Sequence, residues 1–176
     1  ISYIQSTKIR HPIIERIQKN IQYIPNDIVL GHPENNLDGM LLYGVNASGK
    51  SSLMKSIGLN IILAQAGFFV AAEKFVFYPY EYIFTRIGNS DNLFKGQSTF
   101  AVEMSELRNI LKRSNKNSLI LGDELCSGTE SISAISIVSS GVMTLAKKKS
   151  NFIFATHLHD LCKINQIQKL ENVKMF

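Results

Sequence analysis

The sequence predicts an α/β fold in which a mainly parallel β-sheet is flanked by helices and preceded by an N-terminal antiparallel β layer. Three observations lead to this prediction. Short apolar runs typical of buried strands alternate with segments whose apolar residues recur at helical spacing. A glycine-rich turn joins one such run to a helix-like segment, and prolines interrupt the chain before it. Ligands should therefore gather at the carboxyl ends of the parallel strands.

One domain accounts for the whole chain of 176 residues. Its composition, 45% hydrophobic and 19% charged, is that of a globular protein, and a chain of this length buries roughly 70% of its extended surface. We expect residues 1–38 to form the antiparallel layer and residues 39–176 to form the core. Because the chain begins with Ile1 rather than Met, we also expect it to be an excerpt of a longer protein.

Hydropathy, cysteine content and charge narrow the class of protein. No apolar run approaches the ~20 residues that cross a bilayer, so we expect no membrane partner. Two cysteines, Cys126 and Cys162, are too few for a disulfide framework and favour an intracellular, reducing compartment. The net charge of +5 permits a nucleic-acid partner without requiring one. For Lys147–Lys149, a solvated helix end is favoured over a nucleic-acid patch.

The antiparallel layer is predicted from the residues before the glycine-rich turn. Segments 10–15 and 23–30 are short and β-prone, and Pro12 and Pro25 exclude a long helix there. A polar turn over residues 32–39 then leads into the apolar run 40–43.

The remaining elements follow from local pattern. Further strands are predicted at five short runs: residues 74–78, 82–85, 118–122, 151–155 and 170–176. Helices are predicted after the glycine-rich turn, from Ser98 or Thr99, and over the apolar face that runs from Ala134 to Leu145. The polar stretch before Ser98 is predicted as a loop.

The glycine-rich turn, Gly44–Ser52, fits the phosphate-loop pattern G-x-x-x-x-G-K-[ST]. In this pattern backbone amides surround phosphate groups at the start of a helix, where the helix dipole favours negative charge. The alternative is a glycine and serine turn without a ligand. The buried strand before the turn and the apolar helix after it favour a nucleotide site, so we expect a P-loop NTPase.

Each residue of this loop is expected to contact ATP or ADP. The nucleotide-binding residues are Gly44, Val45, Asn46, Ala47, Ser48, Gly49, Lys50, Ser51 and Ser52. The amides of residues 46–50 should hold the β- and γ-phosphates, and Lys50 should neutralise them. The Ser51 hydroxyl should bind Mg²⁺. A solvated surface lysine is the alternative interpretation of Lys50.

Two consecutive carboxylates, Asp123 and Glu124, follow the apolar run 118–122. We expect Asp123 to accept hydrogen bonds from the water ligands of Mg²⁺, and Glu124 to polarise the attacking water as a general base. A solvated acidic loop is the alternative, which the preceding Leu-Ile-Leu disfavours. Since a nucleoside kinase needs no water-activating glutamate, the pair favours a hydrolase.

Other side chains have more open interpretations. His157 follows the strand 151–155 and is expected to reach the γ-phosphate, with a structural histidine as the alternative. His159 and Asp160 also suggest a metal site, but two neighbouring ligands without a third elsewhere disfavour it. Tyr23 is expected to stack on adenine, with core packing as an equal alternative.

Several segments match motifs of one known family. The most specific match covers residues 84–88 and 96–104, which end in Gly-Gln-Ser-Thr-Phe-Ala-Val-Glu-Met. Further matches are Arg10–Pro12, Tyr23–Asp27, Asp123–Thr129 and Phe154–His157, together with Gly44, Asn46, Gly49, Lys50 and Ser51 of the phosphate loop. On these residues the sequence resembles the ATPase domain of the MutS mismatch-repair family, over nearly the whole chain.

This resemblance implies an ABC-class ATPase with Glu124, His157 and Asn46 as catalytic residues. Asn46 would orient the γ-phosphate or the lytic water, and Tyr23 with Ile24 would lie on the adenine side. Ser98 would reach across an interface to the ATP of a second ATPase domain, in a homodimer or a heterodimer. The ATP state of this clamp would control how mismatched or branched DNA is held by domains absent from this chain.

Departures from the family pattern predict a divergent branch with its chemistry retained. Val45, Ala47 and Ser48 replace the usual Pro, Met and Gly, and Cys126–Ser127 replaces the usual Gly-Arg. Two alternatives stay open. One is a transporter-type or other ABC-class ATPase domain, which the absence of a Leu-Ser-Gly-Gly-Gln signature disfavours. The other is a nucleotide-gated binding module with negligible turnover.

Overall fold

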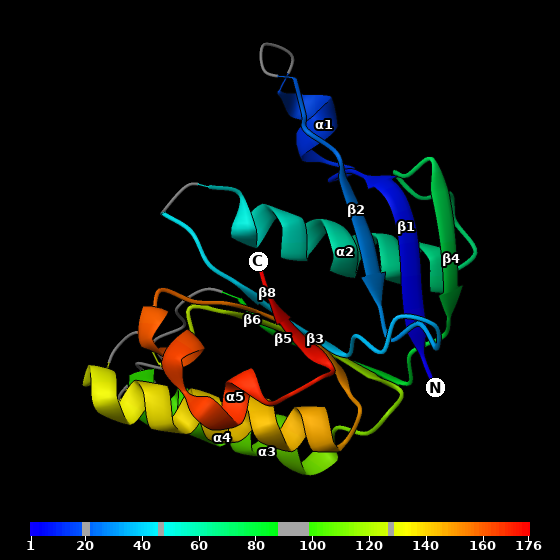
Figure 1. Cartoon of the computed structure of the whole chain (residues 1–176). Helices are drawn as coiled ribbons and strands as arrows, with labels where there is room; N and C mark the ends of the chain where they lie inside the picture. The colour runs from blue at the N-terminus through cyan, green and yellow to red at the C-terminus, as the bar shows by residue number, and fades with distance from the viewer. Residues whose placement is uncertain (19–21, 46–47, 88–98, 127–128) are drawn as a thin grey trace.

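The computed structural model describes residues 1–18, 22–45, 48–87, 99–126 and 129–176 (Figure 1). Its strands are β1 (Tyr3–Ile9), β2 (Asn26–Leu30), β3 (Gly39–Leu42), β4 (Lys74–Tyr78), β5 (Tyr82–Arg86), β6 (Ser118–Asp123), β7 (Asn151–Ala155) and β8 (Val173–Met175). Its helices are α1 (Ile14–Ile17), α2 (Lys50–Gln65), α3 (Thr99–Arg113), α4 (Ser131–Lys147), the 3-10 helix η2 (His159–Lys163) and α5 (Asn165–Gln168). The protein is therefore α/β, as the sequence predicts.

A parallel sheet of five strands, in the order β5-β6-β7-β3-β8, forms the centre of the fold. All five residues of β7 are buried. Strands covered on both faces read as continuous apolar runs, which explains the pattern of residues 151–155. Because β6, β7 and β3 are neighbours, the segments that follow their carboxyl ends lie side by side.

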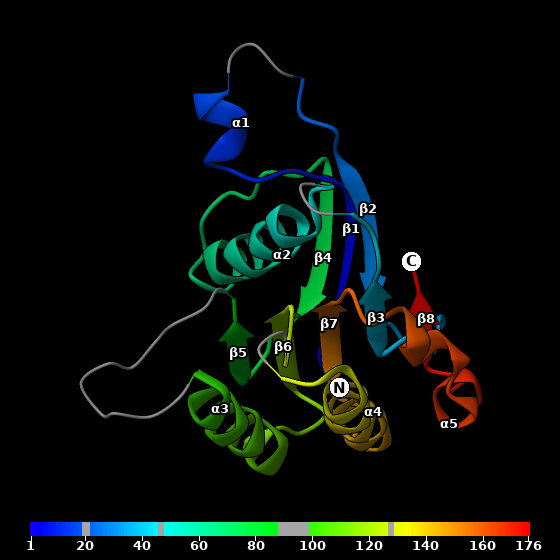
Figure 2. The ribbon, with the colours of Figure 1, turned by 90° about the vertical axis from the view of Figure 1, so that its left-hand side faces the viewer.

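Helices cover both faces of this sheet (Figure 2). On one face, Leu119 and Leu121 pack in a buried cluster with Met54 and Ile57 of α2 and with residues of the antiparallel strands. On the other face, Ile120, Phe152 and Phe154 pack in a second cluster with Val138, Val142 and Leu145 of α4. Each fully buried side chain of this size stabilises the fold by roughly 1.5–3 kcal/mol relative to exposure.

The antiparallel layer is a sheet of three strands in the order β2-β1-β4. It differs from the prediction in three ways. Residues 3–9 form a strand that the sequence did not predict, and residues 14–17 form α1 where a β-prone segment was expected. The third strand, β4, comes from beyond residue 38, because Tyr3 of β1 pairs with Tyr78 of β4. The layer is therefore not confined to residues 1–38.

One of the lysines at the end of α4, Lys148, has partners inside the protein, whereas Lys147 and Lys149 are exposed. The Lys148 ammonium donates hydrogen bonds to the carbonyls of Leu111 (2.6 Å) and Ser114 (2.9 Å), at the end of α3. Cations stabilise these exposed carbonyls because they complement the negative end of the helix dipole. In the described part of the chain, no helix has the length and apolar character that crossing a membrane requires.

Candidate functional site

A cleft of about 660 Å³ opens beside the carboxyl end of β3. The phosphate loop lines it with Gly44, Ser48, Gly49, Lys50 and Ser52, and the segment before β2 lines it with Tyr23 and Ile24. The structure thus brings together two groups of residues that the sequence predicts to bind one nucleotide. Volumes of this size are typical of small-molecule sites.

The loop places the start of α2 against this cleft. Gly49 precedes the helix with φ +95°, a backbone conformation that favours glycine. No described side chain caps the helix at this end, and its first turn holds no acidic residue. Its first N–H groups therefore lack partners within the helix, which is the arrangement that binds anions.

Lys50 is held inside the loop. Its ammonium donates hydrogen bonds to the carbonyls of Gly44 (2.7 Å) and Val45 (2.9 Å). The charge therefore lies beside the cleft and does not extend freely into solvent. Phosphate oxygens are stronger acceptors for an ammonium than neutral carbonyls, so an incoming phosphate would compete for these bonds.

Glu124 and His157 come from neighbouring strand ends and are in contact. Asp123, the last residue of β6, pairs with Ala155, the last residue of β7, and the Glu124 N–H donates to the Ala155 carbonyl (2.9 Å). Glu124 Oε1 then lies 2.7 Å from His157 Nε2. Both side chains stay partly exposed, at 45% and 38%. The carboxylate is therefore oriented by the imidazole and remains accessible to water.

Asp123 has an unusual environment for a carboxylate. Its Oδ1 is buried and has no hydrogen-bond partner among the described residues. A buried acceptor without a partner is costly, and such atoms commonly face an ion or ordered water. Mg²⁺ prefers oxygen ligands and keeps several waters. Together with the Ser51 hydroxyl in the first turn of α2, Asp123 has the donor chemistry that Mg²⁺ requires.

The alternative metal site at His159 and Asp160 gains no support. Asp160 pairs with Lys163 at 2.7 Å, and the hydrogen bond and charge of this lysine lower the pKa of the Asp160 carboxyl. The His159 ring stacks on Tyr43 with centroids 6.0 Å apart. Among the described residues, no group of three His, Cys, Asp or Glu could hold a metal ion.

Tyr23 is half-buried and Ile24 is 79% exposed. Tyr23 thus lines the cleft and is not a member of either buried cluster, while its contact with adenine stays a prediction. Val45 is exposed as well, at 78%. Asn46, Ala47 and Ser98 lie outside the described residues, so their roles stay predictions.

Glu103 is a site residue to which the sequence reasoning gave no role. It lies on α3, is only 6% exposed, and accepts a 2.7 Å hydrogen bond from the Cys126 N–H. This bond fixes the turn after Glu124, where Cys126 has φ +62°. Burial and the nearby Glu103 raise the pKa of the Cys126 thiol to about 11. The sequence does contain a signal for this residue: Glu103 is a charged residue at the helical spacing of Leu107 and Ile110, on the buried face of α3.

A parallel sheet, a glycine-rich loop at its carboxyl edge and an acidic pair on a nearby strand are typical of nucleotide-binding α/β proteins. Residues 40–176 match the family model of MutS domain V. The chain therefore belongs to the MutS family.

Individual relatives agree with this assignment. The chain is 40% identical to a putative DNA mismatch repair protein mutS homolog of Acanthamoeba polyphaga mimivirus, over 99% of this chain and 18% of that protein. It is 43% identical to the mitochondrial DNA mismatch repair protein mutS homolog of Sarcophyton glaucum, over 92% and 16%. It is 42% identical to the DNA mismatch repair protein MutS of Finegoldia magna, over 93% and 19%. The chain thus spans less than a fifth of the length of these relatives.

Proposed function

We propose that this chain is an ABC-class P-loop domain that binds and hydrolyses ATP within a MutS-like protein acting on mismatched or branched DNA. Domain V, which residues 40–176 match, is the ATPase domain of this family. One observation carries the proposal. A single cleft joins Tyr23 and Ile24 to the phosphate loop, and the strands beside that loop lead to the contacting pair Glu124 and His157.

The phosphate loop binds the triphosphate. The free N–H groups at the start of α2 donate to phosphate oxygens. The Lys50 ammonium gives up its hydrogen bonds to the Gly44 and Val45 carbonyls and donates to phosphate oxygens instead. Tyr23 lies against the adenine ring, where a flat side chain supplies dispersion contact. The base and the phosphates are thus bound by different segments of the chain.

Ser51 and Asp123 are the residues that would hold Mg²⁺, Asp123 through water. The bound ion supplies neutralisation of the negative charge on the β- and γ-phosphates. The buried Asp123 Oδ1 without a partner among the described residues supports this role.

Glu124 acts as the general base. It accepts a proton from water while the water oxygen bonds to the γ-phosphorus and the bond from that phosphorus to the bridging oxygen of ADP breaks. His157, at 2.7 Å from the carboxylate, keeps Glu124 oriented. The products are ADP and phosphate.

The parent protein works as a dimer on DNA. Its relatives are named as DNA mismatch repair proteins, and residues beyond this chain would contact the DNA. Two domains of this kind face each other, as a homodimer or heterodimer, and Ser98 of each completes the ATP site of the other. Because the chain belongs to the MutS family, we do not retain the transporter-type alternative.

Steady-state phosphate release from the full-length protein, with DNA present, tests this function. Replacing Glu124 by Gln should leave ATP binding intact and reduce turnover by about 100-fold or more, since general bases contribute factors of this size. No ATP-dependent phosphate release from the wild type would overturn the enzymatic function and leave a nucleotide-gated binding module. Unchanged turnover in Glu124→Gln would assign the base to another residue.

A further inference from the structure

The wall of the cleft that lies away from the phosphate loop has little packing of its own. It includes Ile14 at the start of α1, Gln18 directly after α1, and then Tyr23 and Ile24. α1 has four residues, and none of them is buried. A helix this short is unstable in isolation. The position of α1 therefore depends on contacts made by the residues that precede it in the chain.

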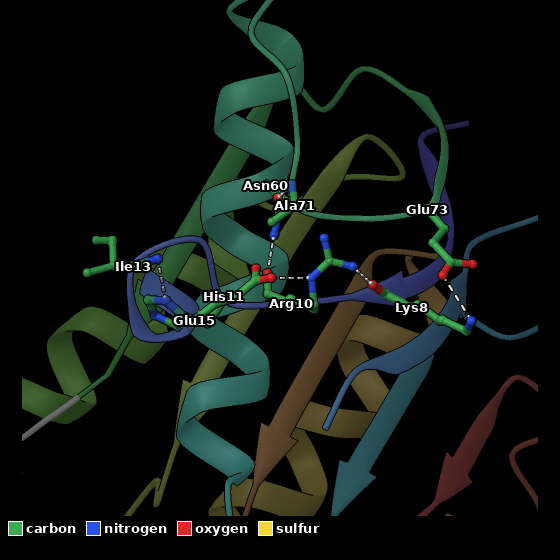
Figure 3. A network of polar contacts seen from close by, with 8 residues as sticks. All are labelled: Lys8, Arg10, His11, Ile13, Glu15, Asn60, Ala71 and Glu73. Atoms are coloured by element: carbon green, nitrogen blue, oxygen red, sulfur yellow. Dashed lines mark hydrogen bonds and ion pairs between the residues drawn. The ribbon is translucent and has the colours of Figure 1, made fainter. Parts of the chain in front are cut away.

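Arg10 and His11 supply these contacts at the start of α1. His11 is only 5% exposed, and its Nδ1 accepts a hydrogen bond from the Ile13 N–H at 3.3 Å (Figure 3). It also accepts one from the Ile14 N–H at 3.3 Å. Arg10 Nε pairs with Glu15 Oε1 at 2.9 Å. The His11 ring thus caps α1, and the Arg10 side chain holds its first turn.

Asn60 ties this segment to α2. Its side chain is fully buried, and its Nδ2 donates to the carbonyls of Arg10 (2.9 Å) and Ser56 (2.8 Å). Its Oδ1 accepts the Ala71 N–H at 2.7 Å, and the Arg10 N–H donates to the Ala71 carbonyl at 2.8 Å. Figure 3 shows Asn60 and Ala71 meeting the chain at Arg10. One amide therefore joins α2, the segment before α1 and the segment before β4.

One helix, α2, is attached both to the phosphate loop and to the wall that includes α1. Lys50 begins α2 at the phosphate loop, and Asn60 lies ten residues along it, which is roughly 15 Å at the rise of an α-helix. Since a helix is stiff over this length, Asn60 holds the α1 wall at a fixed distance from the phosphate loop.

We infer that Asn60 and His11 are positioning residues for nucleotide recognition: they hold the wall that receives the base and have no part in binding the phosphates. This inference rests on the proposed function, because it assigns the two ends of the cleft to the two ends of ATP. It predicts that loosening the wall weakens binding of a ligand with a base and leaves binding of a bare polyphosphate unchanged.

The variants follow from the contacts. Asn60→Asp is nearly isosteric and still accepts from Ala71, but it cannot donate to the carbonyl of Arg10. His11→Ala removes the cap of α1 without changing α2, so it tests the same wall if Asn60→Asp fails to fold. His11→Asn restores an acceptor at the position of Nδ1. Asn35→Asp makes the matched change at an exposed turn residue outside the cleft.

Calorimetric titration of the full-length protein with ATP and with inorganic tripolyphosphate, both with Mg²⁺, gives the test. Asn60→Asp and His11→Ala should weaken ATP binding by about tenfold, the size expected for one lost hydrogen bond. Binding of tripolyphosphate should stay within about twofold of wild type. His11→Asn should recover ATP affinity, and Asn35→Asp should match wild type for both ligands.

Three results would overturn the inference. Wild-type ATP affinity in both wall variants would show that the wall does not position the base. Equal weakening for ATP and tripolyphosphate would show that the residues only support the fold. In both of these cases, ATP binding by the wild-type protein would leave the proposed function standing. A wild type that does not bind ATP would instead overturn the proposed function together with this inference.

Discussion

Replacing Glu103 by Ala should destabilise the protein and slow hydrolysis, because this carboxylate holds the turn that carries Glu124. The Glu103 carboxylate accepts the Cys126 N–H at 2.7 Å and is 6% exposed. Without it, the amide of a residue with φ +62° stays buried and loses this partner. The turn can then relax and move Glu124 away from His157.

The expected magnitude follows from this one hydrogen bond. A bond to a charged acceptor contributes about 1.5–3 kcal/mol, and a buried N–H left unpaired costs a similar amount. Glu103→Ala should therefore lower the free energy of unfolding by about 2–3 kcal/mol. Glu103→Gln should lower it by only about 1 kcal/mol, since the amide oxygen still accepts.

Urea unfolding and steady-state phosphate release, measured on the same preparations, check both effects. Glu171→Ala is the control, because Glu171 is exposed, and it should match wild type. The kcat of Glu103→Ala should fall while that of Glu103→Gln is largely retained. An unfolding free energy of Glu103→Ala within about 0.5 kcal/mol of wild type, the range of ordinary surface substitutions, would refute the reasoning.

Three further predictions concern pH, thiols and the dimer. Burial and Lys55 lower the pKa of His11 from 6.5, so the unfolded chain takes up the proton first. The contribution of His11 to the free energy of unfolding should therefore be complete above pH 6.5 and decrease as the pH falls below it. The midpoint of thermal unfolding should decline less with falling pH in His11→Asn than in the wild type. An identical decline in both would exclude His11 as its source. Cys126, with its pKa of about 11, should be about a thousandth ionised near pH 8 and react with a thiol reagent far more slowly than the half-buried Cys162; equal rates would contradict its burial. A mixture of the Ser98→Ala and Lys50→Ala proteins should hydrolyse ATP faster than either variant alone. If heterodimers are shown to form and the mixture is no faster, Ser98 does not act across the interface.

The parts of the fold that depend on local sequence were predictable. The strand, loop and helix around Gly44–Ser52 lie within one continuous segment, and the loop pattern itself requires that order. The buried run 151–155 could be recognised because a strand covered on both faces is apolar throughout. The position of Asp123 at a strand end could be recognised in the same way, because it follows the buried apolar run of β6.

The parts that depend on distant partners were not predictable from one sequence. β4 joins β1 in a different sheet from β5, although only Pro79, Tyr80 and Glu81 separate the two strands. α1 forms where a β-prone segment was expected, because His11 caps it. Asn60 carries no local signal, since its importance comes from bonds to Arg10 and Ala71. Such contacts become visible only when the chain is folded.

The central claim, that the cleft at Gly44–Ser52 is an ATP site, is tested most directly by equilibrium binding of ATP with Mg²⁺ to the wild-type protein and to Lys50→Ala. Lys50 makes two hydrogen bonds to loop carbonyls that the phosphates would replace. Losing these charged contacts should weaken binding by about 10- to 100-fold. Wild-type affinity in Lys50→Ala, or no binding by the wild type, would contradict the claim.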